Sequence, residues 1–167
     1  MSETATGTDY LQIGGRFTPH IFHPANAFSM KKNRKVKIRE IDRGFGDLVE
    51  TINTEVPSHA VVRILSGCPP IRASDISHFI AERKIERPEL QLFHLYTMLL
   101  QCELTGDSLV DHDDRMYYML VKTPTEALWI VQMDWQREGW GFSANPESVF
   151  DLIKIRTDIG DPILYRG

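Results

Sequence analysis

Residues 116–135, MYYMLVKTPTEALWIVQMDW, decide the fold of this chain. Side chains at every second position of a strand point to the same face, and the second half of the stretch alternates with that period. Residues 123–126, TPTE, supply a short turn between two strands, so the stretch predicts a β-hairpin. The hairpin face expected to be buried carries Ala127, Trp129, Val131, Met133 and Trp135.

Caps and helical spacing of apolar residues predict four helices around this hairpin. Asp42 can cap the first, and residues 74–75 can open the second. The third is expected over residues 88–103, with Pro88 in its first turn, and the last over residues 146–155. The helix at 88–103 is apolar on most of its sides, which predicts a central helix or a dimer interface. The apolar stripe of the first helix is Phe45, Leu48, Val49 and Ile52.

Strands are predicted at residues 33–41 and 59–65, with a last edge strand at 163–165. We therefore expect a single α+β domain over residues 11–167. Its antiparallel sheet includes the C-terminal β-hairpin, packed against a central helical pair (from 74–75 and from Pro88) and a C-terminal helix. Residues 1–10 are small and polar and are expected to be disordered. An aromatic segment, residues 11–28, is expected to pack on the domain as an extended arm.

The composition narrows the class of protein. Two cysteines in 167 residues are too few for a secreted disulfide framework. The first residues lack the pattern of a signal peptide, and every long apolar run is interrupted by charge. We expect a cytoplasmic protein with no membrane partner. A formal net charge of −4 argues against non-specific nucleic-acid binding.

A basic run lies within this acidic chain at residues 31–39. On a strand, its alternate cations would share one face and could contact the phosphates of an anion or a nucleic acid. No aromatic residue interleaves them to stack bases, and charged outer faces also protect edge strands from aggregation. A solvated edge is therefore favoured, and nucleic acid is an unlikely partner. The candidate anion-binding residues are Lys31, Lys32, Arg34, Lys35, Lys37 and Arg39.

His20 and His23 are the most ligand-like pair, because imidazoles three residues apart can reach one transition metal where the backbone turns. The chain lacks the Cys-x-x-Cys and His-Glu-x-x-His patterns, so a metal here is not favoured. The acidic segment Asp111–Asp114 surrounds His112 and could hold a divalent cation or serve acid–base chemistry. A solvated loop is the favoured interpretation, and no cofactor is expected.

Five further residues are assigned to packing or to a surface. Cys68 is expected to be a small structural thiol, and His94 a hydrogen-bonded core histidine. Trp129 and Trp135 share the buried face of the hairpin. Trp140 lies between two glycines and is predicted to be exposed, as a candidate for protein interaction.

No motif in the sequence identifies a reaction. We expect a non-catalytic protein-interaction or regulatory module that binds a protein partner and self-associates as a homodimer. One alternative is a nucleic-acid or anion-binding domain that uses residues 31–39. The other is a small metal-assisted enzyme that uses His20, His23 and the loop at residues 111–114.

Overall fold

The hairpin lies at the centre of the structure. A computed structural model describes residues 10–13, 21–30, 35–65, 70–76, 78, 82, 88–106 and 108–167. Strands β5 (Tyr117–Lys122) and β6 (Leu128–Trp135) pair antiparallel over the whole length of β5. The turn between them places Glu126 at a φ of 70°. The predicted hairpin is confirmed.

Among the described residues, seven strands form one sheet in the order β1-β3-β9-β5-β6-β7-β2. Strands β5 and β9 run parallel, as do β2 and β7, and the other neighbours are antiparallel. The prediction of a purely antiparallel sheet is wrong at these two pairs, because each joins strands that are far apart in the sequence. The other strands of this sheet are β1 (Tyr10–Ile13), β2 (Ile38–Ile41), β3 (Ala60–Leu65), β7 (Trp140–Pro146) and β9 (Ile163–Arg166).

The last strand corrects a second expectation. Strand β9 lies between β3 and β5, inside the sheet and not at its edge. Two consecutive residues of β9, Ile163 and Leu164, are both buried, each in a different hydrophobic core. Consecutive residues of a strand point to opposite faces, so the burial of both is typical of an interior strand.

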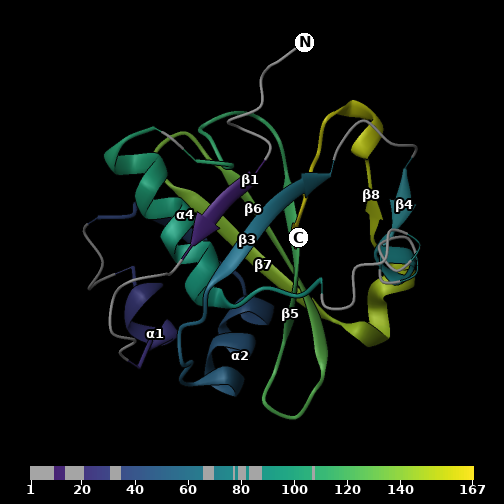
Figure 1. Ribbon diagram of the computed structural model, residues 1–167, viewed down its shortest axis with the longest axis horizontal. Coiled ribbons are helices and arrows are strands. Elements are labelled where there is room, and N and C mark those ends of the chain that lie inside the picture. Colours follow the sequence, from purple (N-terminus) through teal and green to yellow (C-terminus); the bar gives the residue numbers. More distant parts are fainter. Residues whose placement is uncertain are drawn as a thin grey trace.

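Helices cover one face of the sheet: α1 (Pro24–Ala27), α2 (Arg43–Ile52) and α4 (Leu92–Leu104). The α2 cap is as predicted, because Asp42 Oδ1 accepts a hydrogen bond from the Phe45 N–H at 2.8 Å. The predicted apolar stripe of α2 is buried in the larger core. Figure 1 shows these helices on one side of the strands and the short pair β4 (Ile71–Arg72) and β8 (Lys154–Ile155) on the other. None of the helices that the structure describes has the length and apolar composition to cross a membrane.

The opposite face carries a smaller core, to which the 3₁₀ helices η2 and η3 and the β4/β8 pair contribute residues. The predicted C-terminal helix is wrong: β7 stays paired with β6 as far as Pro146, and only a 3₁₀ helix follows. The second predicted helix begins as 3₁₀ helix, and most of residues 77–87 lie outside the described residues. The 3₁₀ helices are η2 (Ala73–Asp75), η3 (Glu147–Leu152) and η4 (Thr157–Ile159).

Helix α4 begins four residues later than predicted. Leu90 is still extended, and its N–H donates to the Leu120 carbonyl of β5 at 2.9 Å. The helix starts at Leu92 because Gln91 acts as its N-cap and the carboxylate of Glu55 accepts the first two helical N–H groups.

The aromatic arm packs on α4. The Phe22 ring lies 5.5 Å from Phe93 and 5.8 Å from Tyr96, and the Phe28 ring lies 5.7 Å from Tyr96. The predicted packing is confirmed for residues 21–28, but the arm is not extended there, because Pro24–Ala27 form α1. Residues 1–9 and 14–20 lie outside the described part. These contacts cover some of the apolar surface on which the expected self-association rests, and self-association stays a prediction.

Candidate functional site

Strand alternation leaves a polar patch at one end of the sheet. In β6, Gln132 and Asp134 point away from the face that the helices cover, because their neighbours in sequence lie in the larger core. Gln132 pairs with Ser143 of β7, and Asp134 pairs with Gly141. The smaller core ends at Ile130 in this strand, so the face beyond it is polar.

Gly141 makes room for the side-chain amide of Gln136 above the sheet. A Cβ atom at Gly141 would overlap with this amide. From its position, Nε2 of Gln136 donates to Glu40 Oε1 at 3.2 Å and to Asp134 Oδ1 at 3.0 Å. One neutral amide thus bridges two carboxylates that come from β2 and β6.

These side chains line an open cleft of about 310 Å³, which also includes Asp42. Among the described residues, no cation forms an ion pair with Glu40, Asp42 or Asp134. Arg39 is close, but its guanidinium donates to the backbone oxygen of Gln136 at 2.8 Å. Three carboxylates without an ion pair to a described cation thus meet in this cleft, and such a group attracts ammonium and guanidinium groups. We call the cleft lined by Glu40, Asp42, Asp134 and Gln136 the acidic cleft.

The predicted basic run reaches the edge of the same sheet. Lys35, Lys37 and Arg39 are exposed, and Val36 between them is buried, as the alternation predicts. Strand β2 begins at Ile38 and not at residue 33, and its register shifts opposite β7 as at a β-bulge. A short, bulged, cationic edge strand is typical of protection against aggregation. The anion site stays a prediction, and three of its residues lie outside the described part: Lys31, Lys32 and Arg34.

The predicted exposure of Trp140 is wrong, because its side chain is fully buried. Its ring lies 5.5 Å from that of Trp135 and 6.5 Å from that of Tyr117. The flanking glycines serve close packing: a Cβ atom at Gly139 would lie 2.8 Å from the Arg39 nitrogen, and one at Gly141 would overlap with Gln136. Trp129 and Trp135, which are expected in the core, are only partly buried against it.

The structure describes only one of the two histidines predicted as a ligand pair. His23 is exposed and precedes α1 without a side-chain capping bond, and His20 lies outside the described part. Within the residues that the structure describes, His23 belongs to no group of three metal-ligating side chains.

The side chains of the acidic loop at residues 111–114 form hydrogen bonds and an ion pair, which a purely solvated loop would lack. His112 Nε2 donates to Glu103 Oε1 at 2.7 Å, and Asp113 forms an ion pair with Arg115 at 2.8 Å. The Tyr117 hydroxyl also donates to Asp113. Burial raises the pKa of Tyr117, so this hydroxyl keeps its proton.

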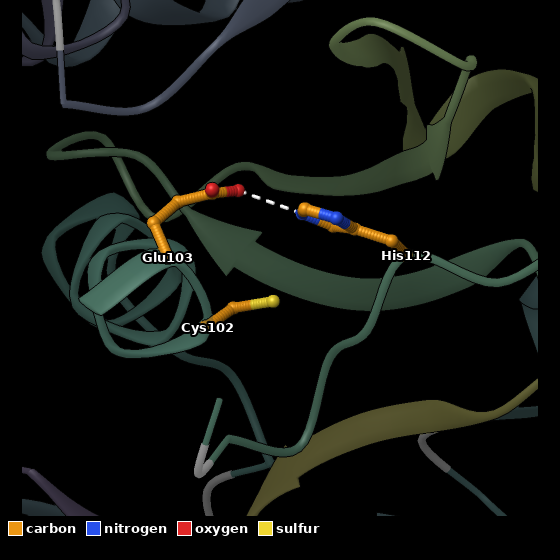
Figure 2. Close-up of side chains that lie close together, drawn as sticks. All are labelled: Cys102, Glu103 and His112. Atoms are coloured by element: carbon orange, nitrogen blue, oxygen red, sulfur yellow. Dashed lines mark hydrogen bonds and ion pairs between the residues drawn. The ribbon is translucent and has the colours of Figure 1, made fainter. Parts of the chain in front are cut away.

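A second group of polar side chains lies where this loop meets the end of α4. Figure 2 shows Cys102 and Glu103 extending from the helix toward His112. One ligand atom from each of the three lies within 4.8 Å of the others. Burial, together with the charges of nearby carboxylates, raises the pKa of the Cys102 thiol to about 11.

Sequence reasoning missed Cys102, Glu103, Gln136 and Glu40 as site residues. Gln136 and Glu40 are 96 positions apart, and only the parallel pairing of β2 with β7 brings them together. A partial signal was present in β6, where two polar residues interrupt the apolar alternation on one face. No protein-family model, no curated protein and no solved structure matches this chain.

Proposed function

We propose that this protein is a binding module whose acidic cleft receives a lysine or arginine side chain of a protein partner. The observation that carries the proposal is the bridge that Gln136 forms between Glu40 and Asp134 over Gly141. The bridge holds two carboxylates at fixed positions before any ligand arrives. Groups that are already in place bind with a smaller loss of conformational entropy.

The geometry of the cleft suits a cationic side chain. The Gln136 amide uses one oxygen each of Glu40 and Asp134, so each carboxylate keeps a second oxygen for a donor. Neighbouring Ser143 donates to Gln132 Oε1 at 3.0 Å, which adds neutral hydrogen-bonding groups. A guanidinium or ammonium group would form charge-assisted hydrogen bonds with these acceptors.

The size of the cleft favours a side chain over a larger ligand. Its volume of about 310 Å³ is at the lower end of the range for small-molecule pockets. The cleft is also open, so its charges are partly screened and the affinity for one side chain is modest. Binding in the micromolar range and strong dependence on salt are therefore expected.

The test is a titration of the full chain with short synthetic peptides, followed by calorimetry and by NMR of backbone amides. Peptides rich in arginine or lysine should bind and shift the signals of Gly141 and Gln136, whereas an acidic peptide should not. The double variant Glu40→Gln with Asp134→Asn should weaken binding at least tenfold, or about 1.4 kcal/mol.

A matched control separates the cleft from the overall acidity of the protein. Glu147→Gln with Asp151→Asn removes the same two charges from exposed positions on η3. This variant should bind within about twofold of the wild type. If both double variants weaken binding equally, or if cationic peptides shift no signal at the cleft, the proposal is wrong.

A further inference from the structure

The end of α4 and the acidic loop bring together three side chains with different donor atoms. Cys102 Sγ, Glu103 Oε1 and His112 Nε2 lie within 4.8 Å of one another (Figure 2). Cys102 and Glu103 are partly buried, and His112 is at the surface. The group is on the helix-covered side of the sheet, because His112 stacks on Trp135, which packs against the larger core. It is thus separate from the acidic cleft.

The imidazole is held in place before any ligand binds. The ring of His112 stacks on the Trp135 indole with centroids 3.6 Å apart and an angle of 6° between the planes. The Trp140 ring contacts the His112 ring in a T-shaped arrangement, with centroids 5.7 Å apart. The backbone N–H of His112 donates to Asp111 Oδ1 at 2.7 Å. These contacts fix the plane of the ring and direct Nε2 toward Glu103.

The surroundings are negative. Glu103, Asp111 and Asp113 all lie close enough to act on Cys102 electrostatically, and only Asp113 of these pairs with a described arginine, Arg115. A bound dication would be stabilised by this excess of carboxylates. Trp140, whose ring lies near that of His112, has a buried Nε1 without a hydrogen-bond partner among the described residues.

We propose that Cys102, Glu103 and His112 form a binding site for a divalent transition metal, for which Zn²⁺ fits best. One sulfur, one imidazole nitrogen and one carboxylate oxygen are ligands that Zn²⁺ takes in tetrahedral sites, whereas Ca²⁺ and Mg²⁺ prefer oxygen alone. The exposed side of His112 leaves the fourth position to water. To bind one ion, Nε2 and Oε1, now 2.7 Å apart, must separate to about 3.3 Å, which follows from metal–ligand bonds near 2.0–2.1 Å in a tetrahedral site.

The direct test is a titration of the full, chelator-treated chain with Co²⁺, followed by competition with Zn²⁺. Binding should reach one metal per chain and produce a near-ultraviolet thiolate-to-cobalt charge-transfer band, which Zn²⁺ then removes. Cys102→Ser should abolish the band, and His112→Gln should weaken binding at least tenfold. Cys68→Ser and His23→Gln are the matched controls, and both should keep the band and the affinity.

Alkylation of the unmodified protein provides a second measurement that does not depend on the folding of a variant. Zn²⁺ should slow the reaction of Cys102 with iodoacetamide at least fivefold, as followed by peptide mass spectrometry. An equal rate with and without Zn²⁺ would overturn the proposal. So would a charge-transfer band that survives Cys102→Ser or disappears in Cys68→Ser.

Discussion

His94 is a fully buried histidine with a backbone partner at each ring nitrogen. The N–H of Gln91 donates to Nδ1 at 2.9 Å, and Nε2–H donates to the Ser58 carbonyl at 2.8 Å. Both bonds require the neutral ring, since a proton on Nδ1 would face another donor. The predicted hydrogen-bonded core histidine is confirmed. Burial lowers its pKa to about 4.

This pKa makes His94 a source of acid instability. Between the unfolded value of 6.5 and the folded value of about 4, the unfolded chain binds a proton that the folded protein does not. Stability therefore falls as the pH drops through this window, by about 3 kcal/mol in total. Urea denaturation between pH 7 and pH 4 should show this loss, and His94→Gln should show a shallower slope.

NMR of the wild-type imidazole gives an independent readout, with His94 staying in the neutral Nε2–H form at pH 5. A His94 signal that titrates near 6.5 would contradict the assignment.

Trp140 should be the tryptophan on which stability depends most. Trp140→Ala leaves a large cavity in the larger core and should cost about 3–5 kcal/mol. Trp129→Ala should cost less, because Trp129 is only partly buried. Trp140→Phe should cost much less than alanine, since it keeps an aromatic ring and removes a buried N–H that has no acceptor among the described residues. The midpoints of denaturant unfolding, compared at constant m-value, rank the stabilities of the three variants. A larger loss of stability in Trp129→Ala than in Trp140→Ala would contradict the prediction.

At the scale of elements, α4 depends on a carboxylate from a distant segment. Glu55 Oε2 accepts from the Leu92 N–H at 3.0 Å and Oε1 from the Phe93 N–H at 2.8 Å. The positive end of the helix favours this charge, although burial raises the pKa of Glu55. Both contacts join the start of α4 to the segment before β3.

Glu55→Ala should therefore destabilise the protein by about 1–3 kcal/mol, because two helical N–H groups lose their acceptor. Glu55→Gln keeps one acceptor oxygen and should cost less. Hydrogen exchange should locate the effect, with faster exchange at the first turn of α4 and little change in α2. Uniformly faster exchange in both helices would show that Glu55 has no local role at α4.

Local patterns were sufficient for some elements and not for others. Asp42 with the stripe from Phe45 to Ile52 predicts α2 correctly, because cap and spacing lie within a few residues. The prediction that α4 starts at Pro88 is wrong, because the actual start depends on Glu55, which is 37 positions from Leu92. The sequence pattern within one helix does not reveal a hydrogen-bond acceptor that comes from a distant segment.

At the scale of the whole molecule, the sheet has two buried faces at its centre and a polar face at one end. The alternation in β6 predicts which side chains share a face. It does not predict that β9 enters between β3 and β5, or that β2 joins β7 in parallel. The acidic cleft depends on that second pairing, which explains why its residues could not be found from the sequence.

In the proposed function, the position of the Gln136 amide, and not acidity alone, makes the cleft a binding site. Gly141→Ala tests it most directly, because the added methyl group displaces this amide and removes no charge. The measurement is the affinity of the variant for an arginine-rich peptide, with melting curves to confirm folding. We predict binding at least fivefold weaker than that of the wild type. An affinity equal to that of the wild type, in a folded variant, would contradict the account.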